Sequence, residues 1–182
     1  MKKLGGVAME TEKRDRQKAA EIVRDAGGKI VGRTRLQKIA YLLQLAGFGD
    51  DFAFEYRHYG PYSEDLANAI RVADVFGLVM ETEQVANWGG LYSIFTSTEQ
   101  AGAREIGPRA TFAELASQID SVELELAATA AFLSAAEGVP DPWEETARRK
   151  PEKVRDGRID KAKDAYRRLL ALKTAKPLPN IV

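Results

Sequence analysis

The stretch FAFEYRHYGPYSEDL, residues 52–66, changes its hydrophobic periodicity partway along. Its first eight residues alternate as in a β-strand, which places ring-bearing side chains on one face: Phe52, Phe54, Tyr56 and His58. This alternation ends at the Gly60-Pro61 step. The sequence therefore predicts a strand over residues 52–59.

The Gly60-Pro61 step predicts the end of that strand, because proline fixes φ and offers no amide hydrogen. We expect Gly60 to hold a conformation that a Cβ atom would strain. Ser63 is a suitable N-cap, and Glu64 and Asp65 after it suit the positive end of a helix dipole. A helix is thus predicted over residues 63–76, with these side chains facing inward: Leu66, Ile70, Ala73 and Phe76.

The flanking segments also have recognisable patterns. Before the strand, the spacing predicts helices over residues 15–26 and 34–46, joined by an extended linker at 29–32. After it, the pattern predicts strands over 78–85 and 91–96 with a Gly-rich loop at 87–90. Two capping boxes, Thr96…Glu99 and Thr111…Glu114, predict short helices. Further helices are predicted over residues 121–137, 143–149 and 158–173.

This order of elements is that of a winged helix-turn-helix unit with an inserted strand. We expect one α+β, mostly α domain over residues 15–174, in which a winged-helix-like unit (15–107) with a small antiparallel sheet precedes a helical half (108–174). Residues 1–14 are predicted to be a disordered lead-in. Residues 175–182 are predicted to be an extended tail, because prolines interrupt them.

His58 is the only histidine and the first candidate for a catalytic or metal-binding side chain. It has no H-x-x-H or H-E-x-x-H partner, and its strand phase predicts a buried or half-buried ring. The chain has no cysteine and lacks the phosphate-loop, dinucleotide-binding and nucleophile-elbow motifs. We therefore expect no catalytic residues, no metal and no cofactor.

No apolar run approaches the ~20 residues that cross a bilayer. The start, MKKLGGVAME, lacks the apolar segment of a signal peptide. We therefore expect a cytoplasmic protein that does not contact membranes. The sequence does not indicate whether the protein forms oligomers.

The formal net charge of zero conceals a strong segregation. Residues 1–38 carry 11 Lys/Arg and 5 Asp/Glu, residues 39–146 carry 4 and 18, and residues 147–182 carry 12 and 4. Two interpretations follow. The basic ends fold back over the acidic middle, or each surface meets a different partner.

Nucleic-acid binding through the winged unit is disfavoured by charge. Lys and Arg supply most of the affinity of proteins for the phosphate backbone. The helix predicted over 63–76 carries Arg71 as its only basic residue, and residues 72–103 contain no Lys or Arg. We expect weak nucleic-acid binding or none. Any such binding would use the basic surface of the first two helices or the basic C-terminal helix.

The segments GRTRLQKIAYLLQ and FEYRHYGPYSEDL resemble the YwgA-like bacterial proteins and, more distantly, the Panacea (SocA-like) antitoxin domain. The resemblance rests on a helix motif and a Gly-Pro corner, formed here by Leu36, Gln37, Lys38, Ile39, Tyr41, Tyr59, Gly60 and Pro61. Tyr62-Ser63 follows the corner where Panacea members commonly have valine, which favours the YwgA-like branch. The Panacea resemblance implies a non-enzymatic adaptor that binds toxins and neutralises them or delivers them for degradation.

Two functions stay open from the sequence. The first is an antitoxin-like, protein-binding adaptor that docks a basic partner, such as a toxin, on its acidic middle. Trp88 is its expected anchor, because exposed aromatic residues are enriched at binding hot spots, with an acidic rim of Glu64, Asp65, Glu81 and Glu83. Alternatively, the Trp88 ring folds back over its own hairpin. The second function is a nucleic-acid-binding transcriptional regulator that uses the basic helices.

Overall fold

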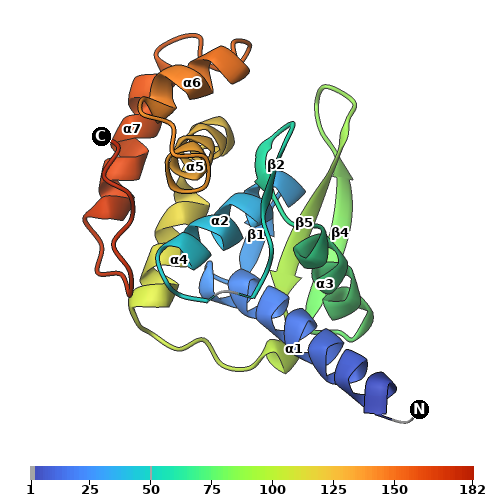
Figure 1. Ribbon diagram of the computed structural model, residues 1–182. Helices are drawn as coiled ribbons and strands as arrows, with labels where there is room; N and C mark the ends of the chain where they lie inside the picture. The colour runs from blue at the N-terminus through green and yellow to red at the C-terminus, as the bar shows by residue number, and fades with distance from the viewer. Residues whose placement is uncertain (1–2, 50) are drawn as a thin grey trace.

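The computed structural model describes the backbone of residues 3–49 and 51–182 and the side chains of residues 9–49 and 51–182. Over these ranges the protein is α+β and mostly helical, with a three-stranded antiparallel sheet of order β1-β5-β4 and a separate hairpin, β2–β3 (Figure 1). The predicted fold class is confirmed. No helix within these ranges combines the length and the apolar character that a bilayer crossing demands.

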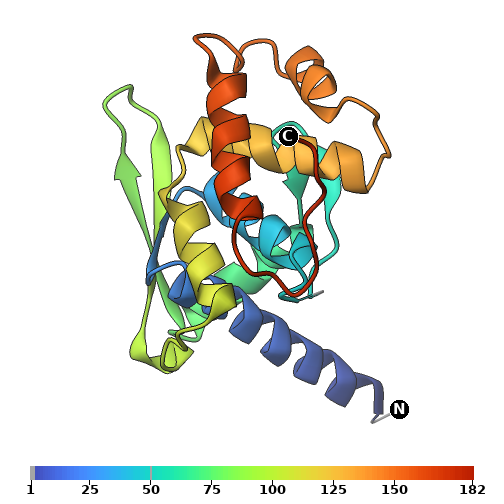
Figure 2. The same ribbon diagram turned by 90° about the vertical axis from the view of Figure 1, so that its left-hand side faces the viewer.

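The first helix, α1 (Lys3–Asp25), is longer than expected. The disordered lead-in predicted over residues 1–14 is therefore wrong from Lys3 onward, and residues 1–2 lie outside the described part. The early turns project beyond the body of the protein (Figure 2), where they need no apolar stripe. Strong helix formers and an i,i+4 ion pair between Glu12 and Arg16 (3.8 Å) favour a helix there. These turns were missed because the prediction relied on the periodic spacing of apolar residues.

A short strand, β1 (Lys29–Val31), follows α1 and pairs with β5. The sequence predicted this segment only as an extended linker. The second helix, α2 (Arg33–Leu45), agrees with its prediction and buries one continuous run of residues from Leu36 to Leu43.

The strand predicted over residues 52–59 is reduced to β2 (Glu55–Arg57). Gly60-Pro61 does not end the pairing but starts the returning strand, β3 (Gly60–Tyr62), with Arg57 opposite Gly60 and Tyr56 opposite Pro61. A two-stranded sheet leaves alternate amides unpaired on its outer sides, so proline is tolerated there.

The turn of this hairpin falls on His58 and Tyr59. The His58 ring is exposed, and its centroid lies 4.7 Å from that of Tyr59 in an edge-on arrangement. The prediction of a buried or half-buried His58 is therefore wrong, because a turn residue does not follow the alternation of a strand.

The third helix, α3 (Glu64–Val75), starts where the sequence predicted, and the Leu66 amide donates to the Ser63 hydroxyl (3.2 Å). Phe76 does not face inward but is 51% exposed, with the Arg16 guanidinium 3.7 Å from the centre of its ring. The predicted wing is present as β4 (Val79–Val85) and β5 (Leu91–Ser97).

Both predicted short helices are present, but neither capping-box threonine, Thr96 or Thr111, is the N-cap. Thr98 precedes the 3₁₀ helix η1 (Glu99–Ala101), and α4 (Pro108–Gln118) begins three residues before Thr111. Proline suits the first helical turn, which explains the earlier start. Asp120 then caps α5 (Ser121–Ala135), whose side chains from Leu124 to Leu133 are all buried.

Two helices, α6 (Pro142–Arg149) and α7 (Arg158–Leu170), complete the helical half. The extended tail is fixed to them: the Trp143 indole donates to the Ile181 carbonyl (2.7 Å) and the Tyr166 hydroxyl to the Pro179 carbonyl (2.9 Å). One cluster of buried apolar side chains includes residues from α1, α3, the sheet and α7, so both halves share a core.

Candidate functional site

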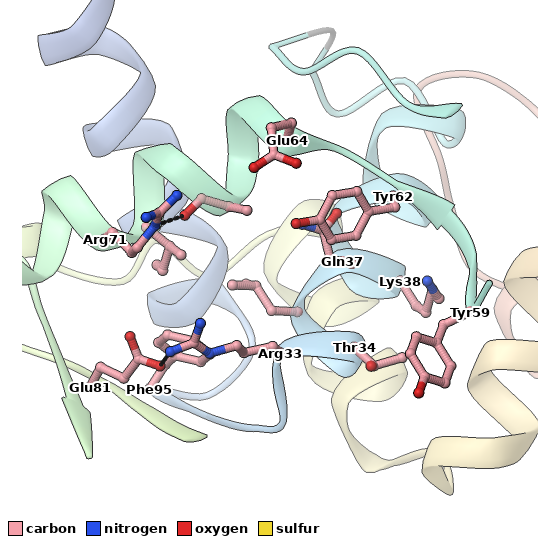
Figure 3. A pocket seen from close by; sticks show the side chains of 13 residues that line it. Arg33, Thr34, Gln37, Lys38, Tyr59, Tyr62, Glu64, Arg71, Glu81 and Phe95 are labelled. Carbon is pink, nitrogen blue, oxygen red and sulfur yellow. Dashed lines mark hydrogen bonds and ion pairs between the residues drawn. The ribbon is translucent and has the colours of Figure 1, made fainter. Parts of the chain in front are cut away.

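A groove with a volume of about 290 Å³ lies between the hairpin β2–β3, the helices α2 and α3, and the wing (Figure 3). Apolar side chains line it from three elements: Leu36 of α2, Ile70 of α3 and Phe95 of β5. Polar side chains surround them, among which Tyr59 and Tyr62 come from the hairpin. In Figure 1 the loops of both hairpins point the same way. From the wing, Glu81 and Phe95 line the groove and the residues of its tip do not.

At one end of this groove, the helix motif of α2 (residues 36–41) meets the Gly-Pro corner (Gly60 and Pro61). In the sequence only the family resemblance connected these two segments. The Gln37 side chain forms two hydrogen bonds with the Ser63 backbone: its Oε1 accepts from the amide (2.8 Å) and its Nε2 donates to the carbonyl (2.9 Å). Both groups are buried. Gln37 therefore fixes the start of α3 relative to α2.

Lys38 is the second link between the motif and the corner. Its Nζ donates to the Pro61 carbonyl (2.7 Å), and the side chain is fully buried. Burial lowers the pKa of Lys38 to about 7, although Glu125 opposes this change. The amine therefore loses its charge near neutral pH, which an exposed lysine does not do.

Raising the pH from 7 to 9 is expected to stabilise the protein through Lys38. The unfolded chain keeps this lysine protonated up to about 10.5, whereas the folded amine loses its proton above about 7. The unfolded state then binds more protons, so the free energy of unfolding rises with pH, by about 2–3 kcal/mol over two units.

Denaturant unfolding of the wild type and of Lys38→Met at pH 6, 7, 8 and 9 measures this effect. The wild type should gain stability relative to the variant above pH 7, and the difference should be constant below it. Parallel profiles over the whole range would contradict a lowered pKa.

The expectation for Gly60 is confirmed. Its φ is +85°, in the region that favours glycine, and an added Cβ would overlap the Thr129 hydroxyl of α5. Within the described residues, this buried hydroxyl has no hydrogen-bond partner. The corner is thus pressed directly against the central helix.

Behind the corner lies a buried ionic cluster around Glu125 of α5. Lys150 donates to Glu125 Oε1 (2.8 Å) and to the His58 carbonyl (2.9 Å), and Lys153 also pairs with Glu125 (2.6 Å). Glu125 and Lys150 are almost completely buried. The cluster joins the basic segment after α6 to the acidic middle of the chain.

Other ion pairs follow the same charge scheme. Basic residues of the two ends pair with acids of the middle: Arg33 with Glu81 (2.7 Å), Arg149 with Glu137 (2.7 Å) and Arg158 with Asp120 (2.8 Å). These contacts favour the first interpretation of the charge segregation, in which the ends cover the middle.

The structure separates the acidic residues that were predicted to bind a partner. Glu64 and Glu81 line the groove, but Glu64 pairs with Arg57 (3.0 Å), and Glu81, whose side chain is 11% exposed, pairs with Arg33. Glu83 lies outside the groove, 3.9 Å from Arg33, and Asp65 is exposed on α3.

Trp88 is 78% exposed at the tip of the wing, yet its ring occupies the space that a side chain at position 90 would need. The ring therefore folds back over its own hairpin. It lines a second, more open hollow of about 640 Å³ that shares Arg33 and Thr34 with the groove. The predicted anchor thus lies beside the groove and not in it.

The remaining motif residues have different positions. Tyr59 lines the groove, whereas Tyr41 is buried with its ring centre 5.3 Å from that of Phe54 and 5.6 Å from that of Phe132. Burial raises the pKa of Tyr41, so its hydroxyl stays protonated. Tyr41 is therefore a core residue.

Several groove residues were not predicted: Arg33, Thr34, Tyr62, Arg71 and Phe95. No local pattern marks them, because they come from elements that only the tertiary structure brings together. Within the described residues, no three His, Cys, Asp or Glu side chains are placed to hold a metal ion.

These features define a winged-helix-like α+β protein with an apolar-floored groove between two hairpins. No family model matches the chain, and no curated protein matches its sequence.

Proposed function

We propose that this protein is a non-enzymatic adaptor that binds a partner protein in the groove between its two hairpins. The observation that carries the proposal is the groove itself, an apolar floor of Leu36, Ile70 and Phe95 inside a polar rim. Protein interfaces combine a buried apolar centre with a polar rim in the same way. An antitoxin-like action, in which binding neutralises or delivers the partner, is the form of this function that the sequence resemblance supports.

The partner need not be strongly basic. Glu64 and Glu81 already have arginine partners, so they offer less attraction than the sequence suggests. Glu83 and Asp65 can still act on approach, because exposed charges mainly affect association rates. The apolar contact then comes from the exposed edges of the floor and from the rings of Tyr59 and Tyr62 beside it.

A photo-cross-linking experiment tests this function in the native host. A photoreactive phenylalanine analogue in place of Tyr62, which lines the groove, is expected to capture one or a few discrete proteins. Adding Ala67→Trp, which fills the groove from α3, should abolish the capture. Ala171→Trp, at an exposed position that does not line the groove, is the matched control and should leave it intact.

The proposal fails if no protein is captured at Tyr62, or if Ala67→Trp leaves the captured set unchanged. Capture of nucleic acid in place of protein would support the alternative of a nucleic-acid-binding regulator.

A further inference from the structure

The charged groups that line the groove are mostly neutralised within the protein. Glu81 pairs with Arg33 and Glu64 with Arg57, while Lys38 is fully buried and burial lowers its pKa to about 7, so that it carries only part of its charge at neutral pH. Arg71 differs from the rest. Its guanidinium donates only to neutral oxygens of its own helix, the Asn68 side chain and the Ala67 carbonyl (3.2 Å), among the residues that the structure describes.

Among the residues that the structure describes, Arg71 is therefore the groove charge with no opposite charge beside it, and this charge is positive. Its side chain is exposed and stands on the α3 wall, with Tyr62 on the same side of the groove and Glu81 below it in Figure 3. A guanidinium has five N–H donors, and the two hydrogen bonds to Asn68 and Ala67 leave others free. Carboxylates are the protein groups that such a fork binds best.

The size and the floor of the groove restrict what else the ligand carries. A volume of about 290 Å³ is at the lower limit of small-molecule pockets, so it holds one or two side chains and not a helix. The floor offers Leu36, Ile70 and Phe95 but few polar partners, which suits an aliphatic or aromatic side chain.

We propose that the groove recognises an acidic–apolar segment of the partner, with one apolar side chain on the floor and a neighbouring carboxylate on Arg71. This inference rests on the proposed adaptor function for the source of the segment. The groove chemistry itself can be tested without the partner.

A polyanion fits these observations less well. Binding to nucleic acid requires several cations along a backbone. Among the described residues that line the groove, only Arg71 is a charged cation without an acidic partner, because Arg33 already pairs with Glu81. A single carboxylate next to an apolar group matches the charge and the size of the site.

Two small probes separate the charge from the apolar contact. Heteronuclear NMR should follow the methyl groups of Leu36 and Ile70 during titration with 4-phenylbutyrate and with its uncharged analogue, 4-phenylbutyramide. The carboxylate is expected to bind with a millimolar Kd, and the amide about 5- to 10-fold more weakly, because it loses the charge-assisted hydrogen bonds.

Arg71→Gln should lower the affinity for 4-phenylbutyrate to that for 4-phenylbutyramide, and it should leave the affinity for 4-phenylbutyramide unchanged. Arg104→Gln, which removes an arginine outside the groove, is the matched control and should bind both probes as the wild type does. Equal binding of the two probes, an unchanged Kd in Arg71→Gln, or no shift of either methyl group would each overturn the inference.

The cross-linking experiment keeps this inference distinct from the adaptor function. Discrete cross-links without charge-dependent probe binding would leave the adaptor function standing and remove the acidic–apolar segment. Charge-dependent probe binding without cross-links would keep the groove chemistry and remove the protein partner.

Discussion

Gly60→Ala is expected to lower the free energy of unfolding by about 2–5 kcal/mol, and denaturant unfolding measures it. Two costs combine. A Cβ at a φ of +85° strains the backbone by about 1–2 kcal/mol. The same atom overlaps the Thr129 hydroxyl, and overpacking a core adds about 1–3 kcal/mol.

Two variants separate these costs. Gly89 has nearly the same φ, +86°, but no heavy atom within 4 Å of an added Cβ, so Gly89→Ala should show the backbone cost alone. Thr129→Ala removes the overlapping hydroxyl, so it should make Gly60→Ala less destabilising when both are present. Equal effects of Gly60→Ala and Gly89→Ala, or additivity with Thr129→Ala, would exclude a close contact between the corner and α5.

Glu125→Gln is expected to cost about 3–5 kcal/mol of stability, the typical loss when one partner of a buried ion pair is removed. The substitution leaves Lys150 buried without a counter-charge and frees Lys153 from the same carboxylate. Thermal or denaturant unfolding at neutral pH provides the measurement.

Glu55→Gln is the matched control, because it removes an exposed partner of Arg57 and should change stability by less than about 1 kcal/mol. The double variant Glu125→Gln/Lys150→Met should be more stable than Glu125→Gln alone, since it removes the stranded charge. If Glu125→Gln is as mild as the control, the cluster does not hold the helical half to the corner.

The features that the sequence predicted correctly have local causes. Ser63 caps α3 because a hydroxyl at that position reaches an amide three residues later, and the wing follows from two strands around a Gly-rich loop. The error at residues 58–61 also has a local origin. Alternation continues through His58, so the pattern cannot reveal that a tight turn starts there.

The candidate site was less predictable because its contacts join distant parts of the chain. Glu125 and Lys150 are 25 residues apart, and Lys150 reaches the His58 carbonyl across 92 residues. In a sequence such charges look like solvated surface, and nothing marks Arg71 as the unpaired one. The resemblance did point to Gln37, Lys38 and the Gly-Pro corner, which the structure joins by hydrogen bonds.

The positions of the two tryptophans give the protein a pair of internal fluorescent reporters. Trp88 is in water at the tip of the wing, whereas Trp143 is 4% exposed and hydrogen-bonded to Ile181 of the tail. Trp88 emission is therefore open to soluble quenchers and Trp143 emission is protected from them. Quenching experiments can thus report separately on the wing beside the groove and on the attachment of the C-terminal tail.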